Sequence, residues 1–526
     1  MRSTASAALR LQYYAGLFLA GLIVSLAVLL TQPAPGYMDA DYYLYGGTRL
    51  VEGYGFTEDV VWNYLGDPDA LPAPSHGYWM PAASVWAALG LWAWRGSAWM
   101  GGRVGFLLLA AFLPVFTAWF ATHLTHNPKH GKLAGWLAVF SGFYLPFLSN
   151  VDTFVMYMLL GSLFILFVGR GGTAQTNKQI AGWMLGVGAV VGLMHYTRAD
   201  GLIWLGIAGL VMMLTRRRFS TTMMAVFALL GGYGLVFAPW MLRNVRAFGS
   251  LLAPGSSRAV WLTSYNDLFA FPAEMLTVAH WWETGFAQIY MARMDALGLN
   301  LQTALVVQGA IFLLPLIIVG GKRLWGDMRV RVGLLAWLTM FVLMTFVFPF
   351  AGARGGFFHA GAAVQPLFWT LAAVGLDAFV SWGTQVRGWK PQAAYSVFGA
   401  GVIGLVALIS GVVFTQRILP DDAQTVYLTY QQVDEVLVVW GAQPDDLVLV
   451  NNPPAYALST GRAALVVPSS GVSSVLAAAD QFGARYLLLD VNFPPTLENL
   501  YRDPATQSGL TLLGQVEDIV IYQVMP

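Results

Sequence analysis

Two carboxylates stand near one another shortly after the first apolar run of the chain. Asp39 and Asp41 lie in the segment Asp39-Ala40-Asp41-Tyr42-Tyr43, at the start of a helical pattern that extends from Tyr42 to Val51. A helix N-terminus attracts negative charge, and a carboxylate held beside a hydroxyl group can accept its proton. These acids are therefore candidates for a general base. The simpler alternative is that they belong to a hydrated loop.

Further polar side chains stand where apolar runs end. Asp152, for example, occupies a very short turn between two hydrophobic helical runs, and His76 precedes Pro81 by five residues. Each position has a structural alternative, because a carboxylate can cap the following helix and an arginine can extend to the membrane surface. The candidates of this group are His76, Asp152, Arg198, Asp200, Arg243, Asn244, Arg354 and His359.

Arginine at such a boundary also suits a phosphate group. The planar guanidinium can donate two parallel hydrogen bonds to phosphate oxygens. Arg354 is followed by Gly355 and Gly356, which allow the backbone to approach a ligand closely, and Arg243 ends an apolar run. Acids and cations at one boundary of a helical bundle predict a site for an anionic lipid substrate.

The composition is that of a membrane protein, so membrane-spanning helices are expected to position these side chains. Of 526 residues, 57% are hydrophobic and only 10% are charged, whereas about 25% charged residues are usual in a soluble chain. The formal net charge of +1 argues against nucleic acid as a partner. The chain has no cysteine, which excludes disulfides, thiolate metal sites and cysteine nucleophiles.

Eleven apolar runs are candidate spans, and loop charge sets their orientation. The runs lie at 11–30, 103–122, 133–149, 153–169, 180–195, 201–214, 222–240, 302–320, 331–350, 360–381 and 396–415. A further run at 79–94 either crosses the membrane or lies along its surface. If it does not cross, the inner segments hold 15 basic residues and one acid, Asp327. The positive-inside rule therefore predicts eleven spans, a cytoplasmic N-terminus and a juxtamembrane or re-entrant helix at 79–94.

This topology places two long loops, 32–102 and 241–301, and the C-terminal segment on the outer face. From residue 416 onward the chain has 4 basic and 12 acidic residues. Short apolar runs predict strands at 447–450, 464–467, 486–490 and 519–524, with a helix at 472–482. We therefore predict an all-α membrane bundle at 1–415 and a small extracytoplasmic α/β domain at 416–526, which serves as a packing or lid module.

The motifs of the chain resemble those of the GT-C fold glycosyltransferases, the superfamily of the protein mannosyltransferases and the aminoarabinose transferase of lipid A. The first outer loop of that family commonly reads D-E-x-Y-Y, followed by L-x-x-G-x-G-F. The present chain has Ala40 in place of the usual Glu. Matching residues, over about 10–415, are Asp39, Tyr42, Tyr43, Leu50, Gly53, Gly55, Phe56, His76, Pro81, Arg103, Asp152, Thr197, Arg198, Asp200, Gly201, Pro239, Trp240, Arg243, Asn244, Arg354 and Pro366.

The resemblance implies an enzyme of a bacterial plasma membrane that glycosylates components of the cell envelope. It would transfer a sugar from a polyprenyl-phosphate donor to a lipid, glycan or protein acceptor outside the cytoplasm, with inversion at the anomeric carbon. Arg354 and Arg243 would contact the phosphate, and a divalent cation, Mg²⁺ or Mn²⁺, could assist the leaving group through ligands that the sequence does not identify.

The resemblance also separates the two acids of the first loop. Asp39 fits the family frame and is assigned as the base, in a loop ahead of the helix. Asp41 is then a helix cap or an auxiliary ligand, since residues two apart do not share a helical face. The expected catalytic group is Asp39, Asp41 and Asp152, and the expected substrate-binding group is His76, Arg103, Arg198, Asp200, Arg243, Asn244, Arg354 and His359.

Two other classes of protein remain as alternatives. A transporter or flippase of lipid-linked saccharides would also need a polar cavity near a lipid head group. Such proteins carry charges at the membrane midplane and often have repeated halves, whereas these spans hold almost no charge and show no repeat. In a non-catalytic membrane scaffold, loss of Asp39 would leave the activity in cells intact.

Overall fold

The computed structural model describes residues 2–94, 96–215, 217–419 and 423–525. Arg216, a member of one predicted inner cluster, lies outside these residues. The chain divides into two compact units, each built from segments that are far apart in sequence. Unit 1 comprises residues 1–32, 103–240 and 293–420, and unit 2 comprises residues 33–102, 241–292 and 421–526.

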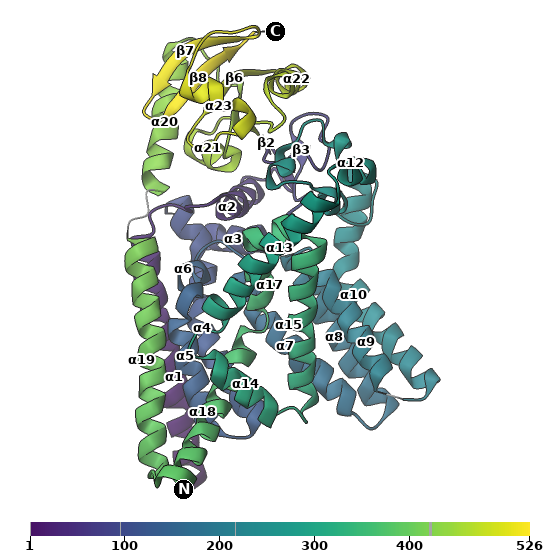
Figure 1. Ribbon diagram of the computed structural model, residues 1–526, viewed down its shortest axis with the longest axis vertical. Helices are drawn as coiled ribbons and strands as arrows, with labels where there is room; N and C mark the ends of the chain where they lie inside the picture. The colour runs from purple at the N-terminus through teal and green to yellow at the C-terminus, as the bar shows by residue number, and fades with distance from the viewer. Residues whose placement is uncertain (1, 95, 216, 420–422, 526) are drawn as a thin grey trace. The chain divides into compact units, whose positions relative to one another are not determined.

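Unit 1 is a helical bundle (Figure 1). Among the described residues, eight helices are long and apolar enough to cross a membrane. They are α1 (Arg2–Thr31), α4 (Ala98–Thr125), α7 (Phe154–Thr173), α8 (Asn177–Thr197), α10 (Phe219–Phe248), α15 (Met328–Val342) together with the π-helical turn Leu343–Val347 that continues it, α18 (Gln365–Arg387) and α19 (Pro391–Val413). A ninth is counted if α5 (Pro128–Phe140) and the segment Gly142–Leu148, bent by 41°, form one span. The protein is therefore a polytopic membrane protein.

The other two predicted spans are helical but short. Residues 201–214 form α9 (Gly201–Leu214), which has 14 residues, and the run 302–320 is divided between a π-helical turn at Thr303–Gln308 and α14 (Leu314–Arg323). The ambiguous run at 79–94 forms α3 (Ala82–Ala93), with 12 residues. At 1.5 Å per residue such helices reach about 15–21 Å, less than the roughly 30 Å of hydrocarbon.

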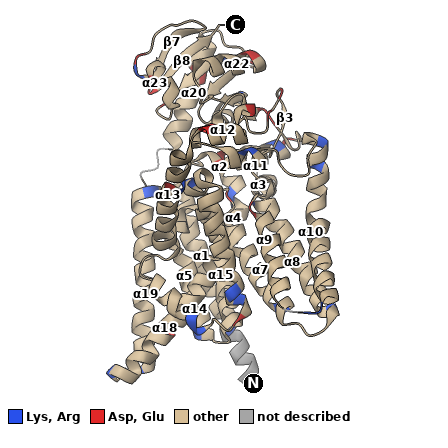
Figure 2. Ribbon diagram, turned by 45° about the vertical axis from the view of Figure 1, so that its right-hand side comes forward, with Lys and Arg blue, Asp and Glu red and all other residues tan. Residues whose placement is uncertain are grey.

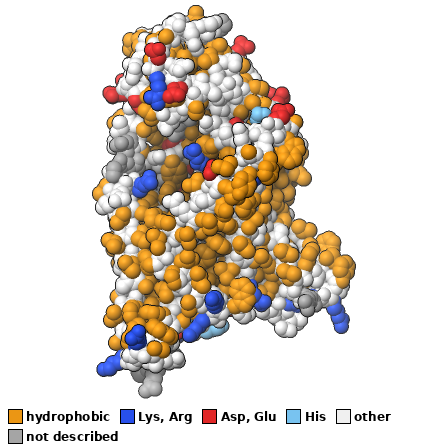
Figure 3. Space-filling view, in the orientation of Figure 1, with side chains coloured by type: hydrophobic (Ala, Val, Ile, Leu, Met, Phe, Trp, Pro, Cys, Tyr) orange, Lys and Arg blue, Asp and Glu red, His pale blue; other side chains and the backbone are white. Residues whose placement is uncertain are grey.

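The surface of unit 1 has the character of a membrane-embedded bundle. Hydrophobic side chains cover its helices on the face shown in Figure 3, and exposed examples include Leu108, Phe227 and Leu235. Lys and Arg residues gather at the helix ends near α14 and α15 (Figure 2). The distribution agrees with a bilayer around the middle of the helices and with a charged boundary at their ends.

Glycine allows α14 and α18 to approach each other closely. A Cβ added at Gly320 of α14 would lie 2.0 Å from the carbonyl oxygen of Leu371, and one added at Gly375 of α18 would lie 2.0 Å from that of Leu316. The contact is therefore reciprocal, with each glycine facing the backbone of the other helix. Close packing of this kind is typical of helices in membranes, where small residues let backbones come together.

Gly375→Ala should therefore destabilise the protein by about 1–3 kcal/mol, the usual range for overpacking, because the added methyl group meets backbone rather than a flexible side chain. The measurement is the melting temperature of the protein purified in detergent. Gly401→Ala in α19 is the matched control, since nothing lies within 4 Å of its added Cβ, and it should leave the melting temperature equal or slightly higher. Equal melting temperatures of the two variants would contradict the packing argument.

Unit 2 contains a six-stranded mixed sheet in the strand order β2-β5-β4-β6-β8-β7. Its strands are β2 (Val60–Val61), β4 (Leu447–Val450), β5 (Ala464–Val466), β6 (Ala484–Leu489), β7 (Leu510–Val516) and β8 (Ile519–Val524). The first four strands in the sheet order run parallel, and the β8–β7 hairpin closes the other edge in the antiparallel direction. The four strands predicted for the tail are thus confirmed. Two strands of this sheet were not predicted: β7, and the edge strand β2, which the first long loop supplies.

Helices cover both faces of this sheet. Side chains alternate between the faces along a strand, so Leu449 of β4 packs in one core with α22 (Val472–Phe482), a helix that was predicted at these residues. Val448 and Val450 pack in a second core with α20 (Ala423–Val439) and α21 (Pro453–Thr460). The result is a three-layer α/β/α arrangement with buried parallel strands. It confirms the predicted small C-terminal α/β fold.

Candidate functional site

The first turn of α2 (Met38–Val51) holds both carboxylates of the first loop. The helix starts directly after Tyr37, whose backbone is extended (φ −162°, ψ 154°). The prediction that Asp39 lies in a loop ahead of the helix is therefore wrong. Positions two apart on a helix differ by about 200° in direction, so Asp39 and Asp41 leave α2 on different faces. Asp41 is 1% exposed, whereas Asp39 is partly exposed.

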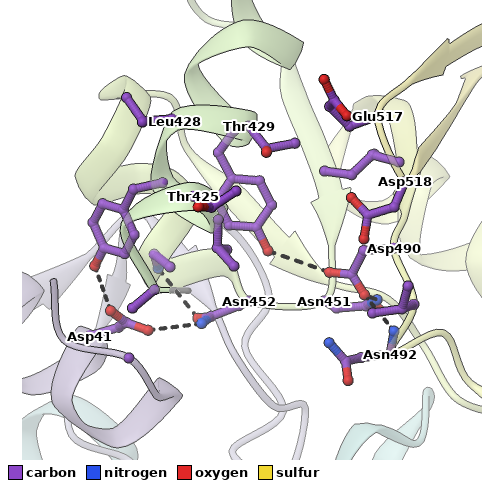
Figure 4. Close-up of a pocket in the computed structure, with 18 of the residues that line it drawn as sticks. Asp41, Thr425, Leu428, Thr429, Asn451, Asn452, Asp490, Asn492, Glu517 and Asp518 are labelled. Atoms are coloured by element: carbon purple, nitrogen blue, oxygen red, sulfur yellow. Dashed lines mark hydrogen bonds between the residues drawn. The ribbon is translucent and has the colours of Figure 1, made fainter. Parts of the chain in front are cut away.

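Asp41 is held by two donors from the C-terminal part of unit 2 (Figure 4). The hydroxyl of Tyr427 donates to its Oδ1 at 2.5 Å, and the amide of Asn452 donates to its Oδ2 at 2.8 Å. Burial raises the pKa of the Asp41 carboxyl to about 7, despite these two hydrogen bonds, which act in the opposite direction. Asp41 also lines a cavity of about 790 Å³ within unit 2, whereas Asp39 does not line that cavity.

His76 is an interior residue of unit 2. Its Nδ1 lies 2.8 Å from the hydroxyl of Ser75 and its Nε2 lies 3.0 Å from the hydroxyl of Ser84. The side chain is 1% exposed, and burial, followed by the charge of Arg243, lowers its pKa to about 3. His76 is therefore a neutral imidazole that joins the loop before α3 to α3 itself.

Tyr42 and Glu58 extend the same buried network. The Tyr42 hydroxyl donates to a carboxylate oxygen of Glu58 at 2.7 Å and accepts from the backbone N–H of His76 at 2.7 Å. Burial raises the pKa of the Glu58 carboxyl to about 8. Glu58 was not among the predicted residues, because nothing in the sequence of a long loop shows which of its acids is buried.

Arg243 and Asn244 close this network from the end of α10. Nη2 of Arg243 donates to the carbonyl oxygens of Phe56 at 3.0 Å and Ser75 at 2.7 Å, and Nη1 lies 3.3 Å from the amide oxygen of Asn244. Asn244 is 1% exposed. Much of the donor capacity of Arg243 is therefore used by the protein backbone.

In unit 1, Asp152 and His359 are brought together although they are 207 residues apart. Nε2 of His359 lies 3.3 Å from the carboxylate of Asp152, and Nδ1 lies 2.9 Å from the carbonyl oxygen of Gly355. Both ring nitrogens thus face oxygen acceptors, and a ring protonated on both would donate to both. Phe154 stacks on the ring, with centroids 3.9 Å apart, and fixes its orientation.

Arg354 occupies an irregular turn immediately ahead of α17 (Phe357–Ala362). Gly355 has φ +115°, a conformation that favours glycine, and it interrupts the helical backbone between Gly352 and Gly356. The side chain of Arg354 is exposed. The glycine turn predicted from the sequence is thus present, and Arg354 stands on it five residues before His359 in the chain.

The other two predicted cations of unit 1 make protein contacts. Arg198 pairs with Asp200 through Nε and Nη2, at 3.1 Å each to one carboxylate oxygen, and the Tyr157 hydroxyl donates to Asp200 at 2.7 Å. Arg103 is 0% exposed. Its guanidinium donates to the carbonyl oxygens of Ser149, Leu29 and Gln32 and to the side chain of Gln32, and so ties α1 and α4 to the turn before α7.

The cavity of unit 2 contains residues that the sequence reasoning missed. Asn451 and Asn452 follow β4, and Asp490 follows β6. These strands are parallel neighbours in the sheet, so the residues after their carboxyl ends lie at one edge, where open α/β sheets usually bind ligands. The predicted strands gave this signal, but their pairing order could not be read from the sequence.

Among the described residues, no group of three or more His, Cys, Asp or Glu side chains is placed to hold a metal ion. A divalent cation that assists the leaving group, as the resemblance allows, stays a prediction.

The fold defines a class of protein. The chain is a polytopic helical membrane protein with a small α/β unit, the arrangement of the GT-C fold. No protein-family model and no curated protein matches the chain, so the likeness comes from solved structures alone.

One such structure is ArnT from Cupriavidus metallidurans bound to undecaprenyl phosphate. It matches with a TM-score of 0.53 and 13% identity over 97% of this chain and 98% of that one. The archaeal oligosaccharyltransferase AglB from Archaeoglobus fulgidus, in complex with an inhibitory peptide and a dolichol-phosphate, matches with a TM-score of 0.53 and 11% identity over 93% of this chain and 70% of that one. A second structure of the Archaeoglobus fulgidus oligosaccharyltransferase, in complex with Zn and sulfate, matches with a TM-score of 0.55 and 11% identity over 90% of this chain and 68% of that one. The GT-C fold predicted from the motifs is thereby confirmed.

Proposed function

We propose that the protein is a membrane glycosyltransferase that transfers a sugar from a polyprenyl-phosphate donor to an extracytoplasmic acceptor. The observation that carries this proposal is the likeness in fold, over nearly the full length of both chains, to ArnT bound to undecaprenyl phosphate. AglB, the second similar protein, is in complex with a dolichol-phosphate. The acceptor could be a lipid, a glycan or a protein.

The residues suggest a division of roles. Asp39 is the candidate base, since it is partly exposed and leaves α2 on a different face from the buried Asp41. Proton removal by Asp39 would make an acceptor hydroxyl a nucleophile toward the anomeric carbon, with inversion of configuration. The bond from that carbon to the phosphate oxygen would break, and the polyprenyl phosphate would leave.

Arg354 is the candidate contact for the leaving phosphate. It is exposed on a turn that a glycine conformation defines, and its planar guanidinium matches the oxygens of a phosphate. Asp152 is better described as a positioning residue, because its buried carboxylate orients His359. Both ring nitrogens of His359 face protein oxygens, so His359 would support the turn that carries Arg354 rather than contact the phosphate itself.

The test is transfer by the purified protein. Membranes or nanodiscs containing the protein are supplied with polyprenyl-phosphate-linked sugars, and the products are analysed by mass spectrometry. In parallel, surface glycans and glycoproteins are compared between cells with and without the gene. Loss of one glycan unit on deletion, restored by the wild-type chain, supports the proposal. Movement of an intact lipid-linked saccharide across the bilayer, without transfer, would replace it with a flippase.

The orientation of the chain in the membrane is also a proposal. A reporter fused after Pro420, a residue outside the described part of the chain, should be extracytoplasmic, and one inserted at Arg217 should be cytoplasmic. The reason is the excess of 15 basic residues over one acid on the assigned inner segments. Alkaline phosphatase and green fluorescent protein report the two sides. A cytoplasmic tail would restore 79–94 as a span and would contradict an outward-facing site.

A further inference from the structure

The cavity of unit 2 has an unusual lining (Figure 4). It has a volume of about 790 Å³ and is formed by the start of α2, the N-terminal part of α20, the ends of β4 and β6, and the turn between β7 and β8. Its acids are Asp41, Asp490, Glu517 and Asp518. No Lys, Arg or His side chain from the described part of the chain lines it. An anionic ligand is therefore disfavoured.

The two inner carboxylates are fixed by the surrounding protein. Asp490 is 9% exposed, and it accepts hydrogen bonds from the Asn451 side chain, from the backbone N–H of Asn492 at 2.7 Å and from the Tyr430 hydroxyl at 3.5 Å. A carboxylate offers about four lone-pair sites, so Asp490 keeps acceptor capacity. Asp41, with two donors, keeps capacity as well.

A hydroxyl group in the same wall makes no hydrogen bond to the described residues. Thr429 lines the cavity from α20 and is only 8% exposed. Other threonines of the chain, such as Thr370, donate to the carbonyl four residues earlier, but Thr429 does not. The Thr429 hydroxyl therefore keeps its donor and acceptor capacity for a ligand in the cavity.

We propose that this cavity binds a small organic cation that carries a primary ammonium group. An ammonium group donates three hydrogen bonds, and it would offset the charge of the carboxylates around it. Three tyrosines, Tyr37, Tyr427 and Tyr430, also line the cavity, and aromatic rings attract organic cations. A metal ion is a poorer fit, because the acids are spread over the wall rather than grouped as ligands. The inference is independent of the transfer reaction proposed above.

The protonation of the cavity supports this choice. Burial raises the pKa of Asp41 to about 7 and also raises that of Asp490. The groups that face the Asp41 carboxyl are Tyr427 and Asn452, and Asp39 stands on the same helix. The groups that face the Asp490 carboxyl are Tyr430, Asn451, Asn492 and Asp518. Below pH 7 the Asp41 carboxyl is mostly protonated and attracts a cation only weakly. Above pH 7 it is mostly a carboxylate, and its negative charge attracts the cation more strongly. Affinity for an ammonium ligand should therefore rise with pH.

The first experiment is calorimetric titration of the full-length protein in nanodiscs with putrescine, with 1,4-butanediol as the uncharged analogue of the same length. Putrescine should bind saturably, and about tenfold more tightly at pH 8 than at pH 6, as expected when a carboxyl of pKa near 7 ionises. A parallel titration with lysinamide identifies the source of the ammonium group: tighter binding of lysinamide points to a peptide side chain, and tighter binding of putrescine points to a free amine.

Variants test the lining directly. Asp518→Asn at the exposed rim should weaken putrescine binding about threefold to tenfold, and Thr429→Val should weaken it by a similar factor without lowering the melting temperature. Asp480→Asn, on an exposed position of α22 away from the cavity, is the matched control and should not change the affinity. No saturable binding of either amine, equal binding of 1,4-butanediol, or an equal effect of Asp480→Asn and Asp518→Asn would overturn the proposal.

Discussion

Asp39→Asn should slow sugar transfer by at least about a hundredfold, the low end for loss of a general base, while the protein still inserts and folds. The amide keeps the size of the side chain but cannot accept the proton of an acceptor hydroxyl. Asp39 lies in the first turn of α2 and is partly exposed, so the substitution does not leave a buried charge unpaired. The measurement is single-turnover transfer with saturating donor, alongside the melting temperature of each preparation.

Asp41→Asn is the matched comparison, two residues along the same helix. Its amide oxygen can still accept from Tyr427, and the amide of Asn452 can turn to accept rather than donate. The rate of transfer should therefore fall by less than about tenfold. A tenfold change corresponds to about 1.4 kcal/mol, which is roughly the contribution of one hydrogen bond. A nearly normal Asp39→Asn beside an inactive Asp41→Asn would reverse the assignment. Full activity of both variants would remove this loop from the chemistry.

The sequence was sufficient for the parts of the fold that follow from local patterns. Apolar runs predicted the long helices, and alternation of apolar residues predicted β4, β5, β6 and β8. The start of α2 was predicted too late, because the pattern of Tyr42 to Val51 does not reveal that Tyr37 is extended and that the helix begins at Met38. The edge strand β2 has only two residues, which is too short for any periodicity.

Contacts between distant segments account for most of what was missed at the site. Arg103 matched a motif position, but only the fold shows that its guanidinium is buried among carbonyl oxygens of α1 and of the turn before α7. Similarly, nothing near Asp41 in sequence indicates Tyr427 or Asn452, which lie 386 and 411 residues away. The sequence therefore predicted which polar side chains lie near the ends of helices. The sheet order and helix packing decide which of them meet.

Arg354→Ala should reduce the use of a polyprenyl-phosphate donor by about ten- to a hundredfold, since a hydrogen bond to a charged group contributes about 1.5–3 kcal/mol. Arg354 is exposed on the turn that Gly355 defines, so its removal should not disturb the packing of α17. The effect should be larger for kcat/KM at limiting donor than for turnover at saturating donor, because the contact holds the phosphate throughout the reaction. The measurement is the initial rate of transfer over a range of donor concentrations.

Arg354→Lys separates charge from geometry at the same position. Lysine keeps the positive charge but lacks the planar fork that matches two phosphate oxygens, so it should recover only part of the loss. Arg258→Ala is the matched control in unit 2, where the arginine is paired with Asp67 at 3.2 Å and donates to the carbonyl oxygen of Leu65 at 3.0 Å. It should leave donor use unchanged. Wild-type rates for Arg354→Ala would exclude this residue from the phosphate site. Complete rescue by lysine would mean that charge alone acts there, and that the bidentate contact expected of an arginine is not made.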